Sequence, residues 1–185
     1  MSRIVVTEFV SLDGVMEDPG GAEGYRHGGW SFKFNDPVGM KFKLDETLAT
    51  GALLLGRVTY EGFAAAWPSV KDDVGFADRM NSMPKYVVSA TLEKAEWNNS
   101  RIIGIDDVER VRDSHQGILL VAGSGALVRG LLERTLVDEV RLMVFPIVLG
   151  SGQRLFDGAP LTRFALADSQ PVGPDGVLVL TYTPA

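Results

Sequence analysis

Two glycine turns in this chain could each bind a phosphate group. The first, at residues 123–125, follows an apolar run that predicts a buried strand over 118–122, and it opens an amphipathic helix. Gly123 and Gly125 allow a sharp turn and the close approach of a ligand. The helix directs free N–H groups and the positive end of its dipole at this point, which suits an anion such as a diphosphate. The alternative is a structural turn that binds nothing.

The second turn begins at Gly56, directly after a strand predicted over 52–55. Arg57 follows and can hold a phosphate through two parallel hydrogen bonds, and Thr59 adds a hydroxyl donor. A capped helix that carries an exposed arginine is the alternative.

A third group of polar residues, Ser89 and Thr91, lies at the end of a strand predicted over 86–89. Sheets of α/β proteins bind their ligands at the carboxyl ends of the strands. If the three strands are parallel, their ends line one edge of the sheet, and a ligand with two phosphate groups could span them.

The elements that position these turns alternate between strand and helix as far as residue 138, and strands predominate afterwards. This pattern predicts one α/β domain over residues 1–185, with a mostly parallel sheet, an antiparallel C-terminal edge and flanking helices. The predicted strands are 3–10, 52–55, 86–89, 101–103, 118–122, 138–149, 164–172 and 177–183, and the predicted helices begin near 36, 57, 74, 106 and 125.

Two features between the first two strands bear on a pocket. The glycine-rich stretch 17–29 and the aromatic residues Trp30, Phe32 and Phe34 suit a pocket wall or lid, although aromatic side chains could equally fill the core. Asp36 and Pro37 then fit the N-cap and first position of a helix. The near-helical spacing of Val38, Phe42, Asp45 and Leu48 predicts that these residues form its packing face.

Composition excludes several classes of function. The net charge is −6, which disfavours a nucleic-acid partner held by phosphate contacts. Cysteine is absent, which excludes disulfides, thiol catalysis and thiolate metal sites, and the two histidines, His27 and His115, lie far apart. We expect no metal. The chain shows neither a signal peptide nor an apolar run of about 18 residues, so we expect a soluble, cytoplasmic protein without a membrane partner.

Six short motifs in order resemble the dihydrofolate reductase superfamily. The chain is most similar to stand-alone relatives of the C-terminal reductase domain of the bifunctional riboflavin-biosynthesis deaminase/reductase, and the similarity covers nearly the whole chain. It implies a dihydrofolate-reductase-like fold. The motifs are Ser-Leu-Asp-Gly at 11–14, Leu-Leu-Gly-Arg-Val-Thr-Tyr-Glu at 54–61, Val-Ser-Ala-Thr at 88–91, Val-Ala-Gly-Ser-Gly-Ala at 121–126, Leu-Val-Asp-Glu at 136–139 and Phe-Pro-Ile-Val-Leu-Gly-Ser-Gly at 145–152.

The resemblance implies that NADPH binds across the sheet edge. The residues it places near the adenosine ribose and its 2′-phosphate are Gly56, Arg57, Thr59, Ser89, Ala90 and Thr91. Those it places at the diphosphate are Gly123, Ser124, Gly125, Ala126 and Leu127, and Gly14 and Val15 would approach the nicotinamide. Asp13, Trp30 and Phe34 are the implied substrate residues.

Two charged residues typical of the riboflavin reductases are missing. Those enzymes usually carry a lysine where this chain has Thr7 and a glutamate where it has Ala122. Because both charges look suited to a phosphorylated substrate, activity in the riboflavin pathway is in doubt. The deaminase half is absent as well, since the chain has no cysteine pair and no zinc-type His-x-Glu.

Two carboxyl groups are candidates for the catalytic acid. Dihydrofolate reductases carry an acid a few residues past an active-site tryptophan, which Trp30 and Asp36 imitate, but a carboxylate that caps a helix would stay ionised and donate a proton poorly. Glu8 lies in the middle of a predicted strand, where burial would raise its pKa. The alternative is that Glu8 is exposed.

The sequence therefore favours an NADPH-dependent reductase that transfers hydride to a small heterocyclic or sugar-bearing substrate, resembling 5-amino-6-(5-phosphoribosylamino)uracil reductase. A nucleotide-binding protein of the same fold that has lost catalysis is the alternative. A Rossmann dehydrogenase is disfavoured, because no acid follows the strand after the glycine turn and the C-terminus is rich in strands. The apolar end of 138–149 suggests a homodimer paired through this strand.

Overall fold

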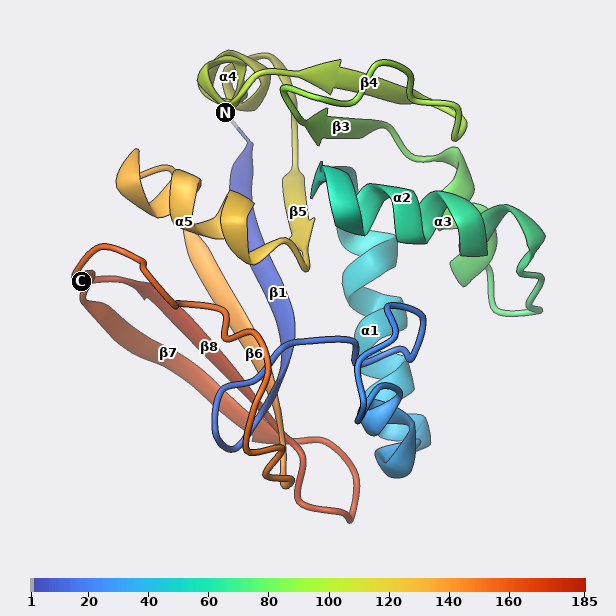
Figure 1. Ribbon diagram of the computed structural model, residues 1–185, viewed down its shortest axis with the longest axis vertical. Coiled ribbons are helices and arrows are strands. Elements are labelled where there is room, and N and C mark those ends of the chain that lie inside the picture. The colour runs from blue at the N-terminus through green and yellow to red at the C-terminus, as the bar shows by residue number, and fades with distance from the viewer. Residues whose placement is uncertain (1) are drawn as a thin grey trace.

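The computed structural model describes residues 2–185, which form one eight-stranded sheet with helices on both faces (Figure 1). The strand order is β4-β3-β2-β5-β1-β6-β8-β7. The first six strands in this order are parallel, whereas β8 runs antiparallel to β6 and β7 antiparallel to β8. The strands are β1 (Arg3–Ser11), β2 (Thr50–Gly56), β3 (Lys85–Val88), β4 (Ser100–Ile103), β5 (Ile118–Ala122), β6 (Glu139–Phe145), β7 (Phe164–Pro171) and β8 (Leu178–Pro184).

The predicted mixed sheet with an antiparallel C-terminal edge is therefore confirmed, and its order differs from that of a Rossmann domain. The helices are α1 (Pro37–Ala49), α2 (Arg57–Ala66), α3 (Phe76–Ser82), α4 (Val108–Ser114) and α5 (Gly125–Glu133), with 3₁₀ helices η1 (Trp30–Phe34), η2 (Trp67–Ser69) and η3 (Ile105–Asp107).

The central strands are apolar because both of their faces are covered. Residues Ile4 and Val6 of β1 face a core that α4 and α5 complete, while Val5 between them faces a second core with side chains from α2 and α3. Figure 1 shows α5 on one side of the sheet and α1, α2 and α3 on the other. This burial on two faces explains the continuous apolar runs of β1, β2 and β5.

The strand predicted over 138–149 is shorter than expected. β6 ends at Phe145, directly before Pro146, which has no N–H group to donate to a strand ladder. It pairs with β1 on one side and β8 on the other, so it is not an edge strand. Its apolar continuation folds back, and Phe145 and Leu149 are buried in the chain's own third core cluster. β6 therefore has no free edge through which two subunits could join their sheets, and the predicted homodimer stays a prediction.

The packing face predicted for α1 is wrong for Val38, Asp45 and Leu48, whereas Phe42 is partly buried against the third core cluster. Val38 and Leu48 are about half exposed, at 53% and 49% of their surface. The buried residues of this helix are the polar Glu46 and Thr47. The helix starts as expected, since the Asp36 carboxylate accepts a hydrogen bond from the amide of Val38 at 2.7 Å. A polar network, together with the packing of Phe42 on the third core cluster, fixes α1 against the sheet.

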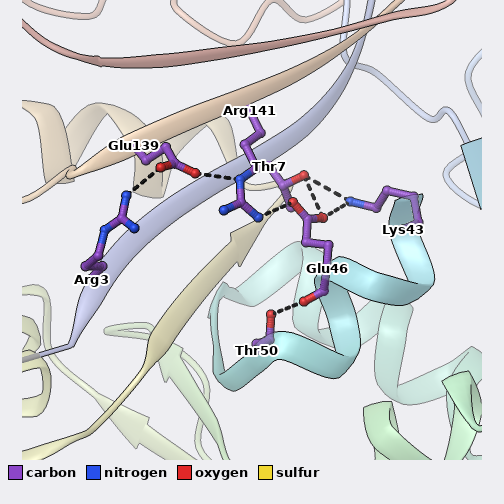
Figure 2. A network of polar contacts seen from close by, with 7 residues as sticks. All are labelled: Arg3, Thr7, Lys43, Glu46, Thr50, Glu139 and Arg141. Atoms are coloured by element: carbon purple, nitrogen blue, oxygen red, sulfur yellow. Dashed lines mark hydrogen bonds and ion pairs between the residues drawn. The ribbon is translucent and has the colours of Figure 1, made fainter. Parts of the chain in front are cut away.

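The carboxylate of Glu46 is the centre of that network (Figure 2). Its Oε1 accepts a hydrogen bond from Arg141 of β6 at 3.1 Å, and its Oε2 accepts bonds from the Thr7 hydroxyl at 3.0 Å and from the Lys43 ammonium group. The parallel register of β1 and β6 places Thr7 directly beside Arg141. Two cations therefore share one buried carboxylate, which ties α1 to both strands.

The network continues across the sheet through Glu139 (Figure 2). This carboxylate accepts bonds from Arg141 at 2.6 Å and from Arg3 at 2.5 Å. Positive and negative groups thus alternate along the row, so each buried charge has an opposite charge beside it, as burial of charge requires.

Replacing Glu46 by leucine should lower the free energy of unfolding by about 3 kcal/mol or more, because Lys43 and Arg141 would lose their shared counter-ion. Urea unfolding followed by circular dichroism measures the change. Asp45→Asn is the matched control on the same helix, since its exposed pair with Lys41 should contribute only about 0.5 kcal/mol or less. Equal losses in both variants would contradict a central role for the buried carboxylate.

Candidate active site

A cavity of about 830 Å³ opens at the carboxyl ends of β2 and β5 and along residues 7–9 of β1. Its walls come from these strand ends, from the loop that follows β1, from α1 and from the first turns of α2 and α5. The three strands predicted to share an edge, β2, β3 and β5, are parallel as expected, but only β2 and β5 bring their predicted polar turns to the cavity. Of the residues predicted from sequence, this cavity brings together Glu8, Gly56, Arg57, Thr59, Gly123, Ser124, Gly125, Ala126 and Leu127.

The two glycine turns are joined by hydrogen bonds. The Ser124 hydroxyl donates to the Thr59 hydroxyl at 2.8 Å and accepts from the Gly56 amide at 2.9 Å. Gly123 has a φ of 66°, and a Cβ at this position would lie 2.9 Å from Thr59 Oγ1. Glycine is therefore required at 123 by both its backbone conformation and the close approach of α2.

The N-terminus of α5 is open to the cavity. Ser124 is its N-cap but makes no side-chain capping bond, because its hydroxyl is used by α2. The amides of the first turn, at Gly125, Ala126 and Leu127, therefore present the donors and partial positive charge that bind anions. A β–α turn of this geometry fits a diphosphate.

Four arginines line the cavity: Arg57, Arg129, Arg134 and Arg154. Arg129 lies against Gly125, with its Nη1 3.4 Å from the position of a Cβ there. Arg57 and Arg134 also line the cavity, and each makes a surface ion pair, with Glu61 at 2.9 Å and Asp106 at 3.0 Å. Because exposed pairs of this kind are weak, both guanidinium groups are available to a phosphate.

Glu8 is a buried carboxyl group at the cavity. Only 6% of its surface is exposed, its Oε1 accepts a hydrogen bond from the Phe9 amide at 3.1 Å, and its Oε2 has no hydrogen-bond partner. Burial raises the pKa of this carboxyl to about 8, although the Phe9 amide and the charge of Lys43 oppose the shift. The predicted burial of Glu8 is confirmed, and at pH 7 the group is mostly protonated.

Asp36 and the hydroxyls after β3 lie outside the lining of the cavity. Asp36 caps α1, so its carboxylate is held by the Val38 amide. The Ser89 hydroxyl accepts bonds from the amides of Thr91 and Leu92, at 3.1 and 2.9 Å, and stabilises a turn. Val88, the last residue of β3, is what this strand contributes to the cavity wall.

The turn at residues 13–15 also lies outside the lining. The Asp13 carboxylate accepts hydrogen bonds from the Ser11 hydroxyl and from the amides of Leu149 and Gly150. These bonds, with that of the Ser11 hydroxyl as the largest cause, lower the pKa of Asp13 to about 2. Asp13 thus anchors the turn to the segment after β6, and the neighbouring Met16 reaches the cavity.

The aromatic residues of the loop divide between core and cavity. Trp30 is fully buried, donates to the Glu17 carbonyl at 2.8 Å and packs edge-on against Phe145. Phe34 packs on the same ring. Phe32, in contrast, is two-thirds exposed and lines the cavity, so only this member of the three forms a pocket wall.

Several lining residues were not predicted from the sequence. Arg129 lies on α5 and Arg134 directly follows this helix. Their closeness in sequence to the glycine turn could have indicated that they line the same cavity. No local pattern marks Lys43, because its position depends on how α1 packs. The other additions include Met16, Ser31, Gln153 and Arg154. The stretch 17–29 was predicted as a pocket wall, and it does contribute Glu17, Pro19, Gly20 and Glu23 to the lining.

Within residues 2–185, no helix is long and apolar enough to cross a membrane. The same residues contain no cluster of three or more histidine, aspartate or glutamate side chains that could hold a metal ion.

Solved structures with the same fold are reductases and their relatives. One is a provisionally assigned riboflavin biosynthesis protein from Shewanella sp. PV-4, with a TM-score of 0.71, 21% identity and 99% coverage of both chains. Another is dihydrofolate reductase from Enterococcus faecalis in complex with NADP(H), with a TM-score of 0.66, 14% identity, and 98% and 96% coverage. The fold is thus that of the dihydrofolate-reductase-like proteins.

The particular family is shown by the sequence. The RibD C-terminal domain family matches residues 2–178, and the chain belongs to this family. It is 26% identical to the uncharacterized protein YyaP of Bacillus subtilis over 161 residues, which cover 83% of this chain and 80% of YyaP. RibD of Acinetobacter baumannii shares the fold at a TM-score of 0.67 and 16% identity, but this chain spans only 58% of its length.

The raised pKa of Glu8 predicts how stability depends on pH. The unfolded chain loses the Glu8 proton near the ordinary pKa of 4.5, whereas the folded chain keeps it up to about 8. The contribution of Glu8 to stability is therefore fully present below pH 4.5 and is lost as pH rises through 8.

Glu8→Gln should remove this loss, so the variant should gain stability relative to the wild type between pH 5 and pH 8. Urea unfolding at a series of pH values measures the difference, and Glu133→Gln, at an exposed position on α5, is the control. A difference between Glu8→Gln and wild type that does not change with pH would contradict the raised pKa.

Proposed function

We propose that this protein is an NADPH-dependent reductase that transfers hydride to a small heterocyclic or sugar-bearing substrate. The observation that carries the proposal is the open N-terminus of α5 in one cavity with four arginines and the buried carboxyl group of Glu8, whose pKa is raised to about 8. The first two features suit a phosphorylated cofactor, and the third suits a reaction that consumes a proton. Membership of a reductase family supports the same conclusion.

The residues around the cavity fit the parts of NADPH. Gly123 to Leu127 would hold the diphosphate through the amides of the α5 turn. Arg57 and Thr59 would hold the 2′-phosphate of the adenosine, with Ser89 to Thr91 at the rim beyond Val88. Met16, set in the wall by the turn at Gly14 and Val15, would lie beside the nicotinamide.

When bound, the reduced nicotinamide would supply the hydride, and the chain's own residues would orient it and exclude water. Glu8 would hold the proton that the substrate takes up. Trp30 and Phe34 would act from the core, by supporting the loop that carries Phe32 into the cavity wall.

The two charges missing from the sequence have neighbours that can take their place. Thr7 and Ala122 are paired across β1 and β5, so the family's lysine and glutamate would have stood side by side here. Lys43 of α1 instead brings its ammonium group to 2.9 Å from the Thr7 hydroxyl. Glu8, the residue after Thr7, supplies a carboxyl group at the cavity. These groups favour a working enzyme over one that has lost catalysis.

The second candidate is a nucleotide-binding protein without catalysis, which the residues Thr7 and Ala122 themselves favour. It predicts firm NADPH binding and no faster oxidation of NADPH with any acceptor tested. The first candidate predicts turnover with at least one acceptor.

Titration of the purified protein with NADPH and NADH, followed by nicotinamide fluorescence, tests the cofactor site. We expect NADPH to bind at least tenfold more tightly than NADH, and Arg57→Ala to remove most of that preference, because a bidentate phosphate contact is lost. Glu61→Ala is the matched control, since it breaks the same surface ion pair but keeps the arginine. No binding of either nucleotide would refute the proposed cofactor site.

A homodimer stays a prediction, although both edges of β6 are already paired within the sheet. Light scattering should give twice the chain mass of 20.0 kDa. A mass of one chain at micromolar concentration would show that the prediction is wrong.

A further inference from the structure

A row of side chains along α2 leads away from the glycine turns. Thr59, Phe63 and Trp67 are spaced four residues apart, and all three line the cavity. Trp67, which ends α2, keeps helical backbone angles, with φ of −61° and ψ of −35°. Residues four apart lie on one face of a helix, and each residue adds 1.5 Å, so the row from Thr59 to Trp67 is about 12 Å long. The cavity therefore continues along an aromatic face beyond the turn that would hold the phosphates.

Packing from behind holds these two rings in place. Phe63 and Trp67 are partly buried against the second core cluster. The Trp67 ring packs edge-on against Phe63, with ring centroids 6.3 Å apart, and lies 5.0 Å from the ring of Phe76. The side-chain amide of Asn81 donates a hydrogen bond to the Trp67 carbonyl at 3.0 Å. The core thus fixes both rings, and each still borders the cavity.

Phe32 brings a third ring to the cavity from the segment after β1. It is two-thirds exposed, although Trp30 and Phe34 in the same segment pack against Phe145. Its backbone is held, because the Phe32 amide donates to the Gly29 carbonyl at 3.2 Å. Large apolar side chains exposed within a cavity are typical of ligand-binding walls. Phe32 therefore has the position of a ligand contact rather than of a core residue.

The charges on this side of the cavity disfavour an anion. The loop that leads to Phe32 also contributes Glu17 and Glu23 to the lining. Burial raises the pKa of Glu23, and the charges of Asp18 and Glu17 add to the shift, so Glu17 lies close enough to act on it. The charge of Lys43, which also lines the cavity, is balanced by the Glu46 carboxylate. A ligand part that binds here should carry no negative charge.

Resting on the proposed reductase function, we propose that the substrate carries an uncharged, flat aromatic ring system and that Phe32, Phe63 and Trp67 bind it. The ring system would lie along α2, and the reducible group of the same molecule would extend back toward the glycine turns, where the nicotinamide would be. Contacts between aromatic rings contribute more than the apolar area they bury. A phosphoribosyl group is neither flat nor apolar and would gain none of these contacts. The three aromatic side chains would therefore determine which substrates are accepted.

Calorimetry with three matched probes tests the proposal, on the purified protein with and without NADPH. The first probe, 2-naphthamide, is flat and uncharged. Its saturated analogue, trans-decahydronaphthalene-2-carboxamide, keeps the carbon skeleton and the amide but is not flat, and 2-naphthoate keeps the rings and adds a negative charge. We expect 2-naphthamide to bind at least tenfold more tightly than either of the others. Because the saturated analogue offers at least as much apolar surface, a preference for the flat ring isolates the aromatic contacts.

Two variants assign the preference to these side chains. Phe32→Leu and Trp67→Leu should each weaken the binding of 2-naphthamide by about three- to tenfold, while the affinities for the saturated analogue and for NADPH stay within twofold of wild type. Phe32 is largely exposed, so folding should not depend on its ring. Phe76→Leu is the matched control, since Phe76 touches Trp67 from outside the lining of the cavity and should affect 2-naphthamide by less than twofold.

Equal affinity for 2-naphthamide and its saturated analogue would overturn the proposal even if NADPH binds. Tighter binding of 2-naphthoate than of 2-naphthamide, or an equal loss in Phe76→Leu and Trp67→Leu, would overturn it as well. A wild-type protein that prefers 2-naphthamide but binds no NADPH would instead refute the proposed function and leave the aromatic site standing.

Discussion

The hydrogen bond between the hydroxyls of Ser124 and Thr59, 2.8 Å long, links the two turns on which the site depends. It holds the start of α2 against the start of α5 and uses the side chain that would otherwise cap α5. The amides at the α5 N-terminus are left for a ligand in consequence. The close approach also explains Gly123, since a side chain there would meet Thr59. One contact thus sets the shape of the cavity edge at the two glycine turns and leaves the amides of the first turn of α5 open to it.

The opposite wall depends on charge rather than on apolar packing. Glu46 is buried between Lys43 and Arg141, and the pairing holds α1 where it borders the cavity. The same pairing balances the charge of Lys43, which leaves Glu8 in an environment where burial dominates its pKa. A structural network and a candidate proton donor are therefore linked through one lysine.

Much of this arrangement could be predicted from the sequence. The rest could not, for physical reasons that differ between the residues concerned. Apolar runs and glycine turns predicted the strands and the edge where β2 and β5 end, because both features are local. The packing of α1 was mistaken, because Glu46 meets Arg141 only through the register of β1 and β6. Aromatic type alone could not separate Trp30, in the core, from Phe32, at the cavity. Lys43 was missed for the same reason as Glu46. The mid-strand position of Glu8 left burial and exposure both open, and the structure shows that it is buried.

The central claim is that one cavity brings a phosphorylated nicotinamide cofactor next to the protonated Glu8. A crystal structure of the protein with NADPH tests it most directly. We predict that the diphosphate contacts the amides at the start of α5 and that the nicotinamide ring lies beside Glu8, with room for a substrate between them. A diphosphate bound away from the glycine turn, or a nicotinamide ring remote from Glu8, would contradict the account.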